Sequence, residues 1–204
     1  LRAGTTTAGL VDLRARLPVM FEALEYRIEH KGELTGVDTG FPSINELTFG
    51  WQPGDLVVIA ARPSIGKTTF VMNSAVATGR AHGTRSAVFS LEMRRAQIEH
   101  RILSNLSGVG LSRILGGYIG AMDYTRLSEA LQGVHDLPIY IDDRAGRSVS
   151  EIRAACRRQK AEHGLDLVIV DYVQLMPGEF DRRATRNEEI TDISRRLKDL
   201  ADEL

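Results

Sequence analysis

The chain has 204 residues, 43% of them hydrophobic and 26% charged, with a formal net charge of −1 at pH 7. This length and composition predict one globular domain with a sizeable core, and the near-neutral charge excludes a histone-like protein that binds nucleic acid through bulk positive charge. The single cysteine, Cys156, excludes an internal disulfide and favours a reducing, cytoplasmic location, and no apolar run approaches the roughly 20 residues that span a membrane.

The N-terminal stretch predicts a linker followed by an amphipathic helix, which we assign together to residues 1–31. Residues 1–9 are small and polar, and apolar residues then recur every three or four positions from Leu10 to Ile28. Pro18 interrupts this pattern, so the helix either starts there or kinks there. The helix packs either on its own domain or on a neighbouring subunit. Because the chain begins at Leu1 without a basic-then-apolar leader, we expect a piece of a longer, non-secreted protein.

The second region, residues 32–204, begins with glycine-rich turns and leads into a first strand. A short helix is predicted from Pro42 to Leu47, and Gly50 to Asp55 form a turn. The β-branched run that starts at Val57 predicts a strand, and the stretch after Lys67 predicts an amphipathic helix.

The loop between this strand and this helix has the context of a phosphate-binding loop. Its glycine allows close approach to phosphates, its lysine can reach the β- and γ-phosphates, and its first threonine can ligate Mg²⁺. The alternative is a chance Gly-Lys-Thr at a helix start. Ala61 stands where the motif has its first glycine, so the loop must turn there without a left-handed residue. The predicted nucleotide-binding residues are Ala61, Arg62, Pro63, Ser64, Ile65, Gly66, Lys67, Thr68 and Thr69.

The rest of the chain alternates strands with helices. Strands are predicted over 85–90, 138–142 and 167–171, and helices over 96–106, 123–134, 148–163 and from Thr185 onward. This alternation predicts a mostly parallel sheet flanked by helices, with right-handed crossovers, in the α/β class. Ligands of such sheets bind at the carboxyl ends of the strands, where the phosphate loop, Glu92 and Asp171 all fall.

Two carboxylates at these strand ends suggest a division of chemical work. Asp171 closes an apolar strand and is predicted to hold Mg²⁺ beside Thr68, although a lone Asp after a strand is often a turn residue. Glu92 is predicted to activate the water that attacks the γ-phosphate. The alternative for Glu92 is a solvated residue at a helix start.

Three arginines, Arg182, Arg183 and Arg186, follow the Asp171 strand and suit contacts with nucleic-acid phosphates. Their alternative is a solvated charged face. Cys156 is predicted to be a small core or boundary residue rather than a nucleophile, and the five histidines have no metal-ligand spacing.

The chain strongly resembles the C-terminal ATPase domain of DnaB-type replicative DNA helicases, from about Leu13 to Leu204. The most specific matching stretches are Phe89-Ser-Leu-Glu-Met93 and Asp171-Tyr-Val-Gln-Leu-Met176, and others are Leu34-Thr-Gly-Val-Asp-Thr-Gly-Phe41, Ala60-Ala-Arg-Pro-Ser-Ile-Gly-Lys-Thr68, Pro138-Ile-Tyr-Ile-Asp-Asp143 and Ile193-Ser-Arg-Arg-Leu-Lys198.

This resemblance implies a RecA-like P-loop fold and a hexameric ring that hydrolyses ATP with Mg²⁺ at subunit boundaries while it moves on single-stranded DNA. It also implies that primase and a helicase loader are partners, and that the stretch before Gly32 is a linker helix docked on the adjacent subunit. In the family pattern Lys67 and Thr68 bind phosphate and magnesium, Glu92 activates water, Asp171 holds magnesium, and the loop of Arg182 to Arg186 faces the central channel. Lys67 and Glu92 are the catalytic assignments.

Relatives continue past the position of Leu204 into a strand, a phosphate sensor, further DNA loops and an arginine finger. We therefore expect residues 1–204 alone to bind nucleotide weakly and to show little or no DNA-stimulated hydrolysis, because an arginine finger is worth about 10³- to 10⁵-fold in rate. Robust turnover by this piece would contradict that expectation.

Two further functions remain open from the sequence. One is a RecA-like recombinase or clock-type ATPase on the same fold, and the other is a non-catalytic, nucleotide-gated scaffold subunit. The Asp171–Met176 stretch and the linker favour the helicase. The residues that speak against the scaffold are the intact Lys67, Thr68, Glu92 and Asp171.

Overall fold

The structure, a computed structural model, describes residues 10–62, 65–178 and 185–204. The chain divides into two compact units, Leu1–Glu33 and Leu34–Leu204, and each is described by itself. Among the helices in the described ranges, none is both long and apolar enough to cross a bilayer.

The first unit is built on one helix, α1 (Leu13–Glu29). Its N-terminus is capped by Asp12, whose carboxylate accepts a hydrogen bond from the Arg14 N–H at 3.0 Å. Pro18 lies inside the helix, so the helix does not start there. No residue of α1 is buried, and its large apolar side chains are 47% to 67% exposed. A helix with an uncovered apolar face lacks the packing that normally stabilises it.

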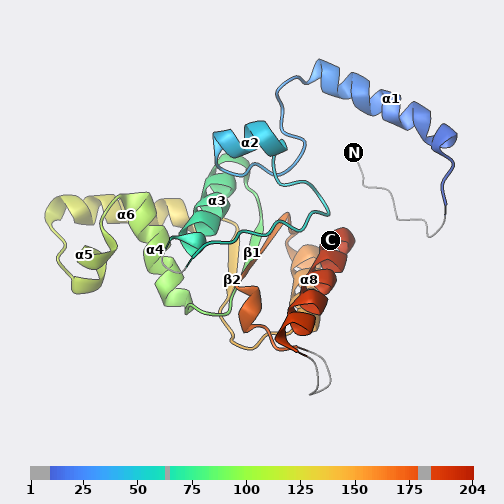
Figure 1. The fold of residues 1–204 in the computed structure, drawn as a ribbon. Helices are drawn as coiled ribbons and strands as arrows, with labels where there is room; N and C mark the ends of the chain where they lie inside the picture. Colours follow the sequence, from blue (N-terminus) through green and yellow to red (C-terminus); the bar gives the residue numbers. More distant parts are fainter. Residues whose placement is uncertain (1–9, 63–64, 179–184) are drawn as a thin grey trace. The chain divides into compact units, whose positions relative to one another are not determined.

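The second unit holds the remaining elements (Figure 1). They are α2 (Pro42–Thr48), α3 (Lys67–His82), β1 (Ser86–Ser90), α4 (Arg95–Ser107), α5 (Leu111–Gly116), α6 (Ala121–His135), β2 (Ile139–Asp142), α7 (Val149–Glu162), β3 (Leu167–Asp171), the 3₁₀ helix η1 (Val173–Leu175) and α8 (Arg186–Glu203). The helices predicted from periodicity and the last three predicted strands are confirmed within one to three residues at their ends.

The three strands form a parallel sheet in the order β2-β1-β3. Ser86 lies opposite Ile139 on one side and Leu167 on the other, and Ser90 lies opposite Asp171. Because all three strands run the same way and helices connect them, the predicted α/β class is confirmed. The carboxyl ends of β1, β2 and β3 therefore meet at one edge of the sheet.

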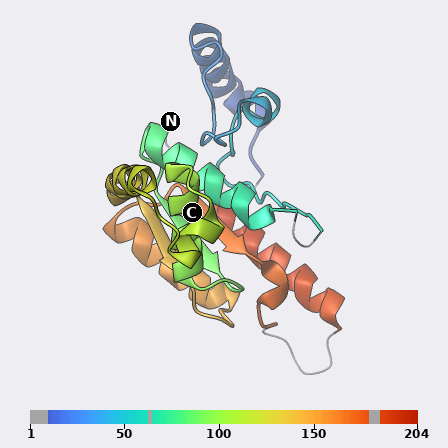
Figure 2. The ribbon, with the colours of Figure 1, turned by 90° about the vertical axis from the view of Figure 1, so that its left-hand side faces the viewer.

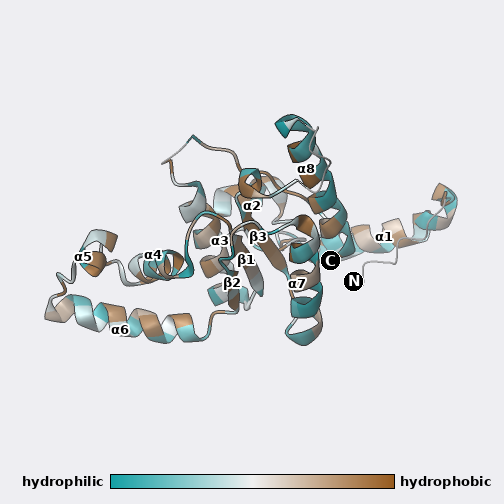
Figure 3. Cartoon of the chain, turned by 90° about the horizontal axis from the view of Figure 1, so that it is seen from below, coloured by the Kyte–Doolittle hydropathy of each residue, from teal (hydrophilic) through white to brown (hydrophobic). Residues whose placement is uncertain are grey.

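Helices cover both faces of this sheet (Figure 3). Successive side chains of a strand point to opposite faces. On one face, Ala87 and Phe89 of β1 pack with buried residues of α7 and α8. On the other face, Val88 of β1 and Ile169 of β3 pack with buried residues of α3 and α4. The apolar strand β3 has packed residues on both of its faces, with Val168 and Val170 toward α7 and α8 and Ile169 toward α3 and α4.

Helices α4, α5 and α6 extend from the α3 side of the sheet, and in Figure 2 this extension points toward the viewer. An ion pair between Arg113 and Asp123 joins the end of α5 to the start of α6, and α6 packs along α4.

The strand predicted to start at Val57 is not formed, which corrects the sequence-based expectation. Residues 55–60 have no strand assignment, and Val58 is 78% exposed. Both edges of β1 are already occupied, and the outer edges of β2 and β3 have no partner strand within the described ranges. A strand exists only when its backbone groups pair with a neighbour, so β-branched composition alone is insufficient here.

The chain that leads into this segment, residues 39–51, is instead attached to α3. The Trp51 indole N–H donates to the Ser74 hydroxyl at 3.3 Å, and Ser74 donates to the Thr39 carbonyl at 2.6 Å. Phe41 stacks on Phe70 with 4.5 Å between ring centroids. These contacts hold the helix that begins at the phosphate loop against the chain that leads into it.

Cys156 lies on α7 and is fully buried in the core, as predicted. Burial raises the pKa of its thiol to about 12, so almost no thiolate exists near neutral pH. We expect iodoacetamide at pH 8 to leave Cys156 unmodified in the folded chain and to alkylate it in denaturant, as measured by intact mass. Rapid alkylation of the folded chain would contradict this placement.

Candidate functional site

The first component of the site is the N-terminus of α3. Gly66 precedes the helix with φ +105°, a conformation that favours glycine, and Phe70 N–H donates to its carbonyl at 2.9 Å. The N–H groups of Lys67, Thr68 and Thr69 begin the helix without a side-chain cap. N–H groups at a helix start and the positive end of the helix dipole make this terminus suited to an anion such as phosphate.

Two side chains from this terminus meet Asp171, which ends β3. The Thr68 hydroxyl donates to Asp171 Oδ2 at 2.5 Å, and Lys67 Nζ lies 3.4 Å from Asp171 Oδ1. Asp171 is only 4% exposed, so its charge is compensated by these two neighbours rather than by water. The structure therefore brings together the ammonium, hydroxyl and carboxylate that the sequence analysis had assigned to one site.

The sheet places Glu92 at the same edge. Ser90 ends β1 opposite Asp171, and the Leu91 N–H donates to the Asp171 carbonyl at 2.7 Å. Glu92 follows directly and is exposed, and in the described ranges its carboxylate has no hydrogen bond or ion pair. A carboxylate that has no partner within the described ranges, at the sheet edge that also carries Asp171, is free to contact a bound ligand or water.

The structure describes Ala61, Arg62 and Ile65 of the remaining loop residues. Ala61 has no positive φ, so the loop turns there without a left-handed residue, as predicted. Arg62 and Ile65 are exposed, and the Ile65 N–H donates to the Arg62 carbonyl at 3.3 Å. The predicted contacts of Pro63 and Ser64 lie outside the described residues.

Sequence reasoning missed Tyr172, whose ring lies beneath the lysine. Lys67 Nζ is 4.2 Å from the centroid of this ring, a cation–π distance. The only available signal was its position directly after Asp171, and a tyrosine after a strand is too common to indicate a contact with a lysine 105 positions earlier.

The donor set fits magnesium rather than a transition metal. Hydroxyl and carboxylate oxygens, as at Thr68 and Asp171, are the hard ligands that Mg²⁺ takes together with phosphates and water. Within the described ranges, no cluster of three or more His, Cys, Asp and Glu side chains could hold a metal by protein ligands alone.

Comparison with known proteins identifies the family. A model of the DnaB-like helicase C terminal domain matches residues 36–204. The chain belongs to this family. Its fold is accordingly a RecA-like ATPase core.

Curated relatives of this DnaB-like domain are replicative helicases. The chain is 37% identical to the Bacillus subtilis replicative DNA helicase DnaC over 97% of its own length and 44% of that protein. It is 46% identical to Rhodothermus marinus DnaB over 90% of its length and 20% of that protein. The chain thus spans less than half the length of these relatives.

Two solved structures superpose closely on the DnaB-like chain. The ATPase domain of G40P has a TM-score of 0.87 at 29% identity, covering 96% of this chain and 68% of that one. A DnaB-like replicative helicase, solved in a study of its interactions with primase, has a TM-score of 0.85 at 29% identity, covering 98% of this chain and 47% of that one.

Of the three arginines predicted to contact DNA, this DnaB-like chain shows the placement of one. Arg186 begins α8, and its guanidinium donates to the carbonyls of Gln174 and Met176 and pairs with Glu189. These contacts fix the start of α8 against η1 and occupy the guanidinium. Arg182 and Arg183 lie outside the described residues.

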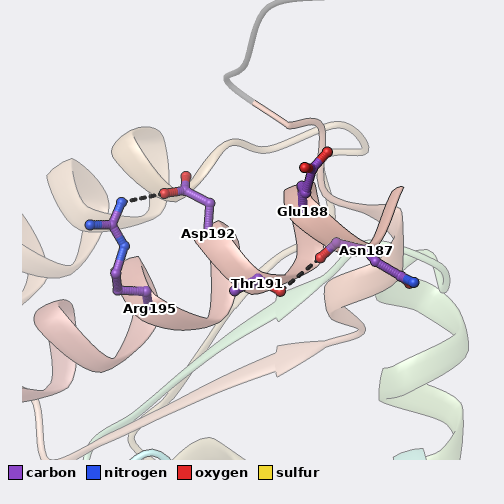
Figure 4. Close-up of a pocket in the computed structure, with 5 residues that line it drawn as sticks. All are labelled: Asn187, Glu188, Thr191, Asp192 and Arg195. Carbon is purple, nitrogen blue, oxygen red and sulfur yellow. Dashed lines mark hydrogen bonds and ion pairs between the residues drawn. The ribbon is translucent and has the colours of Figure 1, made fainter. Parts of the chain in front are cut away.

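A hollow on α8 is separate from these residues (Figure 4). It is lined by Asn187, Glu188, Thr191, Asp192 and Arg195. Within it, Asp192 pairs with Arg195, and the Thr191 hydroxyl donates to the Asn187 carbonyl.

Proposed function

We propose that this chain is the ATP-hydrolysing motor domain of a replicative DNA helicase and uses ATP with Mg²⁺. The observation that carries the proposal is the convergence of Lys67, Thr68 and Asp171 at the uncapped start of α3. Family membership and the names of the relatives as replicative helicases support it.

Each residue then has a distinct task. The N–H groups of Lys67, Thr68 and Thr69 bind phosphate oxygens, and the Lys67 ammonium offsets charge on the β- and γ-phosphates. Thr68 and Asp171 would hold Mg²⁺, which neutralises charge developing on the phosphates. Gly66 lets the backbone turn tightly into the helix.

Glu92 acts on the attacking water. Its free carboxylate is anchored through Leu91 to the Asp171 carbonyl, which keeps it at the phosphate end of the sheet. In this position it accepts a proton from, and orients, the water that attacks the γ-phosphate.

The proposed assembly is a homo-oligomeric ring, with a hexamer as the family form, in which residues 1–31 link to a neighbouring subunit and 32–204 form the motor. The uncovered apolar face of α1, with Leu17, Met20 and Leu24 all about half exposed, supports docking on a second copy. We further propose single-stranded DNA, primase and a helicase loader as partners, and one solved relative was studied with primase.

Nucleotide binding by the chain tests whether Lys67, Thr68 and Asp171 form a nucleotide site. We expect a fluorescent ATP analogue to bind with magnesium-dependent affinity, and Asp171→Asn to remove most of the magnesium dependence. The matched control is Asp166→Asn, which alters the aspartate before β3 that pairs with Arg85 at the opposite edge of the sheet. Equal magnesium dependence in both variants would refute the site, and the absence of ATP-dependent strand displacement by the full-length protein would refute the helicase.

Arg182 and Arg183 give a separate prediction about DNA. In the full-length protein, we expect replacing both by Ala to weaken single-stranded DNA binding and to make the slope of log affinity against log salt shallower by about 1.4, because two phosphate contacts are lost. Arg126→Ala, an exposed arginine on α6, is the control. A salt slope identical to that of the unmodified protein would remove these arginines from the DNA surface.

A further inference from the structure

Glu92 lies in the loop between β1 and α4. Hydrogen bonds fix the backbone of this loop on both sides of Glu92. On the β1 side, the Leu91 N–H donates to the Asp171 carbonyl at 2.7 Å. Inside the loop, the buried Ser90 hydroxyl donates to the Met93 carbonyl at 2.7 Å and accepts from the Met93 N–H at 3.2 Å. These contacts fix the backbone before and just after Glu92.

A third contact holds the loop where it enters α4. The Arg95 N–H donates to Asp143 Oδ2 at 2.9 Å, and Arg95 Nη2 lies 3.4 Å from Asp143 Oδ1. Asp143 directly follows β2, which pairs with β1 on the edge away from β3. The loop is therefore attached to both neighbouring strands, to β3 through Asp171 and to β2 through Asp143, with Glu92 between the two attachments.

We propose that Asp143 is a positioning residue that holds the Glu92 loop in its productive conformation. This proposal rests on the proposed function, in which Glu92 acts on the attacking water. In the described ranges the Glu92 carboxylate has no partner of its own, so its direction is set by the backbone that carries it. On the α4 side the Gln97 side chain accepts from the Arg94 N–H within the helix start, and the Asp143 carboxylate ties the Arg95 N–H to β2.

The chemistry of the contact suits this role. Arg95 is the first residue of α4, and its N–H is one of the donors that a helix start leaves unpaired. A carboxylate there is favoured by both the hydrogen bond and the helix dipole. The hydrogen bond from the Arg95 backbone, the largest cause, lowers the pKa of Asp143, which therefore stays an ionised acceptor at neutral pH.

Two substitutions remove this hydrogen bond from opposite sides. Asp143→Ala removes the acceptor, and Arg95→Pro removes the donor N–H while keeping α4, because proline is favoured at the first helical position. Arg94 has φ −71° and ψ 150°, the extended conformation that a residue before proline adopts. In the full-length protein, we expect each to lower kcat for ATP about tenfold or more with KM for ATP unchanged.

Two variants are matched controls. Arg95→Ala removes the side chain but keeps the N–H, so kcat should stay near that of the unmodified protein. Asp143→Asn keeps an oxygen acceptor at the same place and should restore most of the activity lost in Asp143→Ala. The double variant of Asp143→Ala with Arg95→Pro should be no slower than either single variant, because both remove one shared contact.

Glu92→Gln separates failure of this inference from failure of the proposed function. If Glu92→Gln stops turnover but Asp143→Ala and Arg95→Pro leave kcat unchanged, the positioning role is overturned and the function stands. If Glu92→Gln leaves turnover unchanged, the proposed role of Glu92 fails. Independently of turnover, Asp143→Ala in the chain should speed amide exchange at Arg95 but not inside α3, and unchanged exchange at Arg95 also overturns the inference.

Discussion

Replacing Glu92 by Gln is expected to slow ATP turnover by the full-length protein by about 100- to 10 000-fold while nucleotide affinity is retained. Glutamine has nearly the same shape but does not accept a proton as a carboxylate does. The Glu92 side chain is exposed and has no partner within the described ranges, so the substitution should cost no stability. Steady-state hydrolysis and binding of a fluorescent nucleotide measure the two effects separately.

The matched control for this variant is Glu99→Gln, which changes another exposed glutamate, on α4, in the same way. Its turnover should equal that of the unmodified protein. Unchanged turnover in Glu92→Gln would remove Glu92 from the mechanism.

The second large effect is expected for Lys67→Ala, which should weaken ATP binding about tenfold to a hundredfold. The ammonium of Lys67 lies at the start of α3, and a hydrogen bond to a charged group contributes about 1.5–3 kcal/mol. Competition against a fluorescent nucleotide gives the affinity of the chain.

Folding must be checked in the same variant, because Lys67 also compensates the buried Asp171 carboxylate. Thermal unfolding without nucleotide measures the stability lost with the Lys67–Asp171 ion pair. Asp171 keeps its hydrogen bond from Thr68 in this variant. Lys31→Ala, which alters an exposed lysine in the first unit, is the control. An affinity equal to that of the control would exclude Lys67 from phosphate binding.

Much of the fold could be predicted because its signals are local. Helical periodicity, the Ser148 and Thr185 capping residues and the apolar 167–171 run specify elements within a few residues of chain, and the structure contains them. The predicted strand at Val57 failed because a strand depends on a partner, and pairing is decided by residues far away in the sequence.

The site also has a part that the sequence predicts and a part that it does not. Lys67, Thr68 and Asp171 could be assigned to one place because parallel strands align their carboxyl ends and a phosphate loop begins a helix at that edge. The Lys67 contact with Tyr172 and the Asp143 contact with Arg95 could not be predicted. Each joins residues 48 or more positions apart through side-chain geometry that no spacing in the sequence encodes.

The uncovered stretch around Val57 and Val58, together with the one-sided pairing of β3, has a consequence for handling this chain. Within the described ranges, β3 has hydrogen-bonding backbone on a side that no strand occupies, and a β-branched apolar segment lies in solvent. Such surfaces are templates on which identical chains add to one another as extra strands. We therefore expect residues 1–204 expressed alone to self-associate increasingly as their concentration rises.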